Sequence, residues 1–211
     1  MLAVDTALGA CSVAVLDGDT VLAHQFVEMT RGHAEALAPM VEETMRKAGI
    51  SFAALDRLAV TTGPGTFTGQ RVGLAFMRGL KVALKKPLVG ITTLEAMAFA
   101  TGAGRAAAIH DAKREEAYLL LWDKDEVVLP PAVMPLQEAL ARIRAFGPCA
   151  LCGTGAVQAK AALREQFNLT EIRQPDALWV GKLAMTRPVP DRPPAPLYLR
   201  APDAKLPGAR P

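Results

Sequence analysis

The sequence predicts an α/β protein of two similar lobes, each a mixed sheet flanked by helices. The first observation behind this prediction is an internal repeat, because moving the chain by 106 residues places residue 2 over residue 108 and continues without a gap. The second is that each copy reads as three strands followed by a helix, a strand and a helix. The third is a glycine-rich joint between the copies, Thr101-Gly102-Ala103-Gly104. We therefore expect one lobe over 1–102 and another over 103–211. The matching segments are 2–5 with 108–111, 13–17 with 119–123, and 21–22 with 127–128.

The elements of the first lobe follow from periodicity and turn residues. Two short strands are expected within 2–16, and Asp17-Gly18-Asp19 makes a tight turn into a third strand at 21–27. A helix follows over 33–48, because its apolar residues fall on one face and its charged residues on the other. Gly49 ends this helix. The later elements are a strand at 58–62, a helix at 68–85 that stops before Pro87, a strand at 88–91 and a short helix at 93–100.

The second lobe repeats this order more loosely. It contains a helix at 136–146, a strand that ends in the glycine turn Cys152-Gly153-Thr154-Gly155, and another helix. A unit of this length that occurs twice is a duplicated lobe and not a solenoid. Two such lobes facing each other describe the actin, sugar-kinase and Hsp70-like (ASKHA) architecture, in which the first hairpin of each lobe grips one end of a nucleotide's phosphates.

Composition indicates a cytoplasmic globular protein. Of the 211 residues, 51% are hydrophobic and 21% are charged, which is the range of chains that bury a core. The start, Met1-Leu2-Ala3-Val4-Asp5, has no cationic residue, and no run of 18 apolar residues occurs, so neither a signal peptide nor a membrane span is expected. Three cysteines, an odd number, do not suggest a secreted disulfide framework.

Cysteines and histidines give no convincing metal or redox site. On a strand, Cys149 and Cys152 would lie about 10 Å apart on opposite faces, beyond the reach of a disulfide. No second Cys/His pair completes a zinc site, so we expect buried structural cysteines. The histidines His24, His33 and His110 share no metal-ligand spacing, and His33 is expected at a helix start.

The net charge of +3 is supplied by the C-terminal tail, because the rest of the chain is close to neutral. We expect this Pro-rich tail to be solvated, and the alternative is a weak contact with an anionic partner such as RNA. Its charged residues are Arg187, Arg192, Arg200, Lys205 and Arg210 against Asp191 and Asp203.

The turn Gly63-Pro64-Gly65-Thr66-Phe67-Thr68-Gly69, between a strand and a helix, has two interpretations. Glycines such as Gly63 and Gly65 permit close backbone approach, and the following helix N-terminus offers N–H groups that could hold an anion. Alternatively, the segment is a tight turn before a buried helix. The first hairpin is compatible with phosphate contacts, since Asp5 could hold a metal-bound water and Thr6 or Ser12 could donate hydrogen bonds.

The second hairpin, Asp111-Ala112-Lys113-Arg114-Glu115-Glu116-Ala117, does not match the first. It has no glycine, and it carries two carboxylates that would repel phosphate. A nucleotide site shared by both hairpins is therefore broken, and any contacts left in the first lobe are vestigial. The sequence also has no Walker A loop and no nucleophile elbow.

The helix at 68–85 is apolar almost all round, which indicates burial on more than one side. It could pack between the sheet and its neighbouring helix. The sharper interpretation is that this helix and the one at 33–48 also present an apolar face to another chain. The residues expected at that interface are Leu37, Met40, Val41, Met45, Gly69, Val72, Gly73 and Phe76.

Three segments, in order along the chain, resemble the TsaB (YeaZ) family, the dimerisation subunits of the bacterial machinery that makes N6-threonylcarbamoyladenosine (t6A) at position 37 of tRNA. The likeness extends over nearly the whole chain and includes the terminal Lys205-Leu206-Pro207-Gly208, although the preceding Arg200-Ala201-Pro202-Asp203 departs from the family's pattern. The three segments are Leu2-Ala3-Val4-Asp5-Thr6-Ala7, Gly63-Pro64-Gly65-Thr66-Phe67-Thr68-Gly69-Gln70-Arg71-Val72-Gly73 and Pro196-Leu197-Tyr198-Leu199-Arg200.

The resemblance implies a degenerate relative of an enzyme. This family is similar in fold to TsaD, which transfers the threonylcarbamoyl group with a metal held by two histidines four residues apart. The corresponding positions here are Thr93 and Met97, and neither replaces histidine as a ligand in such a site. The resemblance further implies pairing with a TsaD-type transferase through the first-lobe helices, with a TsaE-type ATPase at the interface. ATP and a metal are expected in those partners, and no cofactor is expected in this chain.

We therefore predict a non-catalytic partner subunit needed for threonylcarbamoyl transfer to adenosine 37 of tRNAs that read ANN codons. It is expected to be a homodimer when alone, to contact tRNA only indirectly, and to have no membrane contact. The alternative is an active phosphotransferase or metallopeptidase (glycoprotease-like) of the same fold. A plain RNA-binding module is disfavoured, because the sequence has no basic face outside the tail and no set of stacking aromatic residues.

Overall fold

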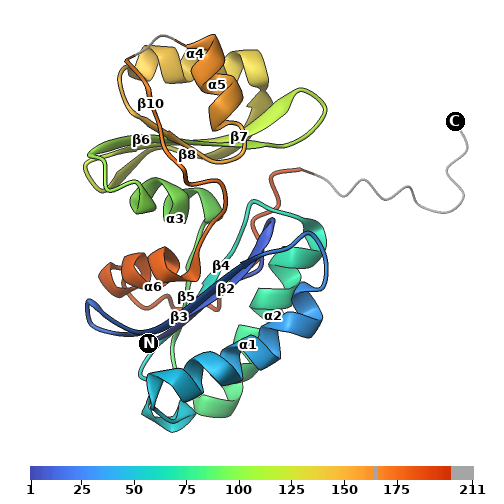
Figure 1. Ribbon diagram of the computed structural model, residues 1–211, viewed down its shortest axis with the longest axis vertical. Coiled ribbons are helices and arrows are strands. Elements are labelled where there is room, and N and C mark those ends of the chain that lie inside the picture. Colours follow the sequence, from blue (N-terminus) through green and yellow to red (C-terminus); the bar gives the residue numbers. More distant parts are fainter. Residues whose placement is uncertain (164–165, 201–211) are drawn as a thin grey trace, which may run out of the picture.

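Two five-stranded mixed sheets form the framework of the computed structural model, which describes residues 1–163 and 166–200 (Figure 1). The first sheet has the order β3-β2-β1-β4-β5, and the second has the order β10-β9-β6-β7-β8. The strands of the first sheet are β1 Leu2–Asp5, β2 Ala10–Asp17, β3 Thr20–Glu28, β4 Leu58–Thr61 and β5 Leu88–Ile91. The strands of the second are β6 Arg105–Asp111, β7 Glu116–Asp123, β8 Glu126–Pro135, β9 Ala150–Cys152 and β10 Asn168–Leu169.

The helices fall close to the predicted ranges, and several ends have identifiable caps. Gly49, in the left-handed region, ends α1 as predicted. Thr92 and Glu95 form a reciprocal capping box at the start of α3. The helices are α1 His33–Ala48, α2 Phe67–Leu84, α3 Thr93–Ala100, α4 Leu136–Phe146, α5 Ala156–Ala162 and α6 Ala177–Thr186, with a short 3-10 helix at Phe52–Ala54.

The two sheets repeat the same strand pairing, which confirms the two-lobe α/β prediction. In each lobe the first strand pairs antiparallel with the second and parallel with the fourth, as β1 does with β2 and β4, and β6 with β7 and β9. The bounds of β2 shifted by 106 residues coincide with those of β7. The register is lost at the next helix, because α4 begins three residues earlier than the shifted α1 would.

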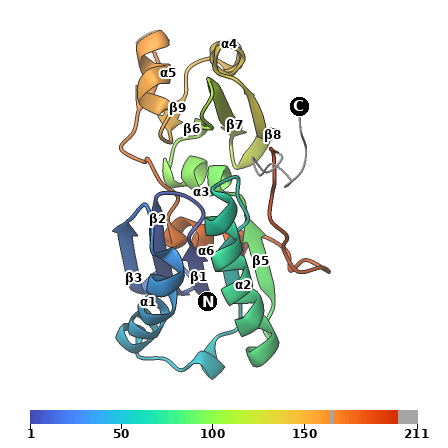
Figure 2. The same cartoon turned by 90° about the vertical axis from the view of Figure 1, so that its right-hand side faces the viewer.

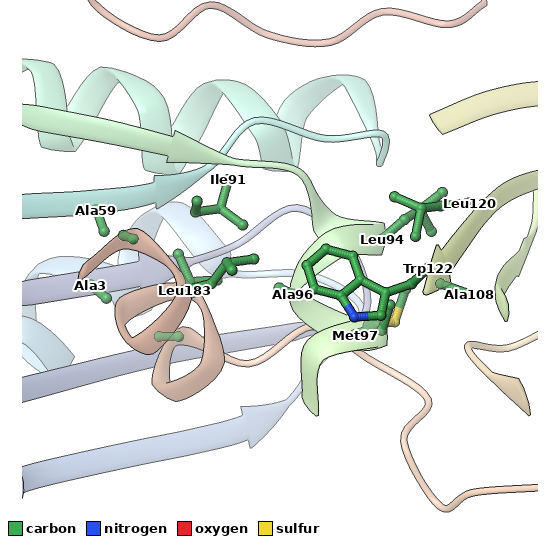
Figure 3. Packing of buried hydrophobic residues seen from close by; sticks show 14 of the residues in the cluster. Ala3, Ala59, Ile91, Leu94, Ala96, Met97, Ala108, Leu120, Trp122 and Leu183 are labelled. Carbon is green, nitrogen blue, oxygen red and sulfur yellow. The ribbon is translucent and has the colours of Figure 1, made fainter. Parts of the chain in front are cut away.

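The helices and sheets form a stack of layers (Figures 1 and 2). Helices α1 and α2 cover the outer face of the first sheet, and α4 and α5 cover the outer face of the second. Helices α3 and α6 lie between the sheets and contact each other. Figure 3 shows the resulting core, in which Leu183 of α6, Met97 of α3 and Trp122 of β7 belong to one buried cluster. This cluster joins the lobes.

The last helix crosses back to the first lobe. Helix α6 packs on β1, β2 and β4, although the division at residue 103 assigned it to the second lobe. Gly181 makes this approach possible, because a Cβ there would lie 3.2 Å from the Cβ of Ala3. The sequence boundary therefore does not describe how the end of the chain packs. None of the helices in the described part of the chain has the length and apolar composition needed to cross a bilayer.

Candidate functional site

The glycine turn that precedes α2 is locked against the first hairpin. Thr66 caps α2, because its hydroxyl accepts a hydrogen bond from the Gly69 N–H (3.0 Å), and its own N–H donates to the Ala7 carbonyl (2.8 Å). A Cβ at Gly65 would collide with the Ala7 carbonyl, and a Cβ at Gly69 would collide with the Thr6 carbonyl. Of its two interpretations, the structure favours a tight turn that brings α2 onto the sheet.

The hydroxyl groups of the first hairpin are engaged inside the first lobe. The Thr6 hydroxyl donates to the Gly69 carbonyl (2.7 Å) and accepts from the Gly73 N–H (3.0 Å). The buried Ser12 hydroxyl accepts from the N–H of Ala177, the first residue of α6 (2.8 Å). Both hydroxyls, either of which could donate to a phosphate according to the sequence, are therefore paired within the chain.

Asp5 is a fully buried carboxylate at the end of β1. Its Oδ1 accepts hydrogen bonds from the Thr61 hydroxyl (2.6 Å) and the Ala7 N–H (3.2 Å), while Oδ2 has no partner among the described residues. Burial raises the pKa of Asp5 to about 7, against the lowering effect of those two hydrogen bonds. Asp5 does not line the cavity between the lobes, so its position gives no support to a metal-bound water there.

Helix α3 supports the glycine turn from the other side. The Thr93 N–H donates to the Gly63 carbonyl (2.9 Å), and the Thr93 hydroxyl donates to the Pro64 carbonyl (2.6 Å). The peptide bond between Gly63 and Pro64 is cis. Met97, one turn later, is buried in the interlobe core. A fixed hydroxyl and a core thioether therefore occupy the two positions that the resemblance assigns to the metal-binding histidines of TsaD. Within the described residues, no three His, Cys, Asp or Glu side chains gather that could hold a metal.

The second hairpin, between β6 and β7, has an irregular turn without glycine. Lys113, Arg114 and Glu115 all have positive φ, at 65°, 56° and 59°. The Asp111 carboxylate accepts a hydrogen bond from the Lys113 N–H at 2.8 Å, and this bond holds the pKa of Asp111 below its usual value. The same carboxylate pairs with the Lys113 ammonium at 3.1 Å, so its charge is balanced within the turn.

A cavity of about 460 Å³ separates the two hairpins. Its lining includes Gly65, Phe67, His110, Lys113 and Tyr198. His110 is only 8% exposed, and its Nδ1 lies 3.1 Å from the Thr154 hydroxyl of the second glycine turn. Burial lowers the pKa of His110 to about 4, so the imidazole is neutral at physiological pH.

The segment after α6, residues 187–200, is here called the C-terminal strap. It runs along the first lobe and is held there by several contacts, whereas residues 188–193 are exposed, so the predicted solvated tail is found in part of the segment (Figure 2). Arg187 pairs with Glu95 at 3.1 Å, and Arg78 donates two hydrogen bonds to the Pro194 carbonyl (2.6 and 3.2 Å). Gly90 leaves room for the strap, because a Cβ there would clash with Pro194.

The end of the strap joins the two lobes. Tyr198 stacks on Phe67 with ring centroids 5.5 Å apart, and its hydroxyl accepts a hydrogen bond from Arg71 (2.7 Å). Arg200 then donates to the Ala112 carbonyl (2.8 Å) and pairs with Glu116 of the second hairpin. The negative charge of the Glu116 carboxylate is therefore balanced by Arg200 of the same chain. The charged tail residues Asp203, Lys205 and Arg210 lie outside the described residues.

The residues expected at a partner interface mostly face the protein's own core. The side chains that α1 was expected to offer are buried against the first sheet, and Gly69 and Gly73 of α2 are buried against Thr6. Val72 and Phe76 are half-buried and pack on the same core. The buried α1 residues are Leu37, Met40, Val41 and Met45. The partner interface itself stays a prediction, because an apolar periodicity identifies a packed face without identifying everything that covers it.

The exposed apolar residues of α2 are not the ones named for the predicted interface. Ala75, Gly79, Val82 and Ala83 are exposed and recur at helical spacing on one side of the helix. Val82 is 75% exposed, and a Cβ at Gly79 would meet open space. The signal was present in the sequence, because a helix apolar all round must leave part of its apolar surface outside a two-layer packing.

The remaining candidates have structural roles. His33 is the first residue of α1, as predicted, and His24 Nε2 lies 2.7 Å from Asp176 Oδ1. The cysteines are free and buried, and Cys149 and Cys152 belong to different core clusters, which confirms that they face opposite sides. Burial raises the pKa values of the Cys11 and Cys149 thiols to about 11.

Comparison with known proteins relates the whole arrangement to the machinery of tRNA modification. The family model described as TsaD, tRNA N6-adenosine threonylcarbamoyltransferase, matches residues 20–181. The chain is 38% identical over 130 residues to the tRNA threonylcarbamoyladenosine biosynthesis protein TsaB of Escherichia coli K12, which covers 60% of this chain and 56% of that protein. It is 32% identical over 207 residues to an uncharacterised protein of Mycobacterium tuberculosis H37Rv, and the match covers 97% of this chain and 93% of that protein. The chain spans about half the length of the curated TsaB proteins it matches, 56% in Escherichia coli and 51% in Haemophilus influenzae.

Solved structures give the same relationship. An uncharacterised protein from Pseudomonas aeruginosa with similarity to the peptidase YeaZ superposes with a TM-score of 0.80 at 29% identity, over 94% of this chain and 98% of that chain. The activator of 2-hydroxyisocaproyl-CoA dehydratase from Clostridium difficile superposes with a TM-score of 0.52 at 12% identity, over 88% of this chain and 94% of that chain. The second likeness concerns the fold alone, and it confirms the ASKHA architecture predicted from the repeat.

Proposed function

The chain belongs to the TsaD family as a TsaB/YeaZ-like protein, and from this membership we propose that it is a non-catalytic partner subunit for threonylcarbamoyl transfer to adenosine 37 of tRNA. In this proposal it binds and supports a TsaD-type transferase, together with a TsaE-type ATPase. Those partners supply the metal and the ATP, and this chain supplies neither. The tRNAs concerned are those that read ANN codons.

One observation supports the proposal most directly. The side-chain groups that an active ASKHA site would direct at a ligand form hydrogen bonds within this chain instead. The hydroxyls of Thr6, Ser12 and Thr93 form hydrogen bonds with backbone groups of the same chain, and Asp5 is fully buried. The Thr93 and Met97 side chains offer no imidazole for a metal. The arrangement supports a scaffold more than a catalyst.

The exposed face of α2 is the surface that we assign to the partner. Ala75 and Gly79 are small and would let another helix approach closely, while Val82 would lose its exposed apolar area on pairing. The same face would serve a homodimer when the chain is alone.

The test uses Gly79→Arg, because the substitution adds a long cation at an open helix position without disturbing a packed one. Val157→Arg on α5 is the matched control, since Val157 is an exposed apolar residue on a helix of the other lobe. We expect Gly79→Arg to abolish co-elution with the TsaD-type partner, dimerisation in sedimentation and t6A formation in a reconstituted reaction. Val157→Arg should retain all three. Undiminished pairing of Gly79→Arg would reject this face.

The function itself is tested by omission. Purified transferase and ATPase should modify tRNA at least tenfold more slowly without this chain, and adding the chain should restore the rate. Full modification in its absence would reject the proposed role. Calorimetry of the chain alone with ATP and magnesium distinguishes the alternative, because micromolar binding with turnover would identify an active phosphotransferase instead.

A further inference from the structure

A second cavity, of about 430 Å³, lies where the C-terminal end of α2 meets the strap. Its lining combines cationic residues from two segments that are far apart in the sequence. Those segments contribute Lys81, Lys85 and Lys86 at the end of α2, and Arg192 and Asp191 in the strap. The cavity therefore carries a net charge of +3, from four cations and one carboxylate, which equals the net charge of the whole chain.

Among the described residues, these cations form no ion pair with a carboxylate. Within residues 1–163 and 166–200, the strap's ion pairs are those of Arg187 with Glu95 and Arg200 with Glu116, and none involves the four cations of the cavity. Lys81 and Lys86 are half-buried and line the cavity. Concentrated, unpaired positive charge of this kind attracts an anionic ligand.

The cavity is built by specific contacts. Lys85 ends α2 in the left-handed region (φ 54°), which turns the chain at Lys86 toward β5. The opposite wall is the proline-rich part of the strap, and Arg78 holds it to α2 through its two hydrogen bonds to the Pro194 carbonyl. The sequence was read as having no basic face outside the tail, and this folded arrangement corrects that reading.

We propose that this cavity binds the phosphate backbone of RNA, specifically of the tRNA that the proposed function names and on which this inference rests. Lysine ammonium groups act on phosphate as point charges, and backbone contacts of this kind position a nucleic acid without reading its bases. A free nucleotide is disfavoured, because the residues that line this cavity include no aromatic side chain on which a base would stack. The subunit thereby contacts the substrate directly, in addition to supporting the transferase.

The experiment measures binding of a fluorescently labelled, unmodified tRNA transcript as a function of salt concentration, with the full chain alone and with its transferase partner. The variant Lys81→Glu/Lys86→Glu reverses two cavity charges and leaves the special backbone of Lys85 unchanged. The control Lys124→Glu/Arg142→Glu makes the same change in net charge on exposed residues of the second lobe. Inorganic phosphate and ATP are included as competitors.

We expect the cavity variant to bind tRNA about tenfold more weakly at low salt, and the slope of log K against log salt to fall in magnitude by about 1.4–1.8, since each of the two lost phosphate contacts removes about 0.7–0.9. The control should change affinity by less than about twofold. If phosphate or ATP displaced the labelled tRNA as effectively as unlabelled tRNA does, the RNA site would be rejected. Equal tRNA binding by the cavity variant and the control would reject it as well.

Two further readouts separate this inference from the proposed function. If the cavity variant loses co-elution with the transferase, the basic surface is a protein interface and the RNA site is rejected. If the variant supports t6A formation as well as wild type at subsaturating tRNA, the RNA site is rejected while the subunit role stands. Failure of the omission experiment above rejects the subunit role itself.

Discussion

The Thr6 hydroxyl oxygen lies 3.0 Å from the amide nitrogen of Gly73, and a methyl group on Gly73 would lie 2.8 Å from that same oxygen. The pair connects the end of β1 with the second turn of α2. The helix approaches the strand at this distance only because residue 73 has no side chain.

Gly73→Ala is therefore expected to lower the free energy of unfolding by about 1–3 kcal/mol, because the new methyl group overpacks the contact with Thr6. Gly79→Ala, two turns later in the same helix, should raise it by about 0.4–1 kcal/mol, since its Cβ meets nothing and alanine restricts the unfolded chain. Urea denaturation of both variants checks the pair. Similar stabilities of the two would contradict the packing argument.

Asp5 should make the protein less stable as pH rises. The folded pKa, about 7, exceeds the ordinary value of 3.8, so between these values the folded state binds a proton that the unfolded state has lost. The stabilising contribution is complete below about pH 4 and is lost as pH rises through 7, with a total on the order of 4 kcal/mol.

Asp5→Asn isolates this effect, because the amide oxygen can still accept from Thr61 and Ala7 while the titration disappears. The free energy of unfolding of wild type minus that of Asp5→Asn should fall between pH 4.5 and 8. His110, whose folded pKa is lowered, has the opposite pH dependence, and it cancels in the difference. A difference that stays constant with pH would show that Asp5 does not titrate in this range.

The contact between Phe67 and Tyr198 should couple the strap to α2. A double-mutant cycle of Phe67→Ala and Tyr198→Ala is expected to give an interaction energy of about 0.5–1.5 kcal/mol in urea denaturation. Tyr198→Phe is the control, because it removes only the hydrogen bond from Arg71 and keeps the stacked ring. Additive effects of the two alanine substitutions would mean that the rings do not stabilise each other.

The three cysteines should resist thiol reagents in the native state. All are buried, and burial raises the pKa values of their thiols, so the reactive thiolate is scarce at pH 8. Labelling with a chromogenic disulfide should be slow in buffer and should reach three thiols per chain in guanidinium chloride. Rapid native labelling of any thiol would contradict the burial described here.

Much of the fold could be predicted from the sequence, because the repeat and the local periodicities are strong. The helix at 33–48 has the predicted bounds, and the β2 to β7 correspondence holds residue by residue. The packing of α6 could not be predicted in this way. Its apolar residues indicate a buried helix, but nothing local in the sequence says that β1 and β2, more than 150 positions earlier, receive it.

The candidate site was predicted less well for the same reason. Asp5, Thr6 and Ser12 were identified by residue type, yet whether each faces the cleft or the lobe interior depends on partners such as Thr61, Gly73 and Ala177. Lys81 and Arg192 form one cavity only after the strap has folded along α2. Residue type and spacing therefore indicated the chemistry of these groups without indicating their direction.

The position of α6 has a consequence for how the protein is made. During synthesis, β1 and β2 leave the ribosome long before residues 177–186, which cover one face of their sheet. That face, including Ala3 and Leu16, is not covered by α6 until residues 177–186 have been synthesised. The core of the first lobe beneath α1 and α2 needs no residue beyond 88, whereas the opposite face of the same sheet is completed only by a helix that follows the last strand of the second sheet in the chain.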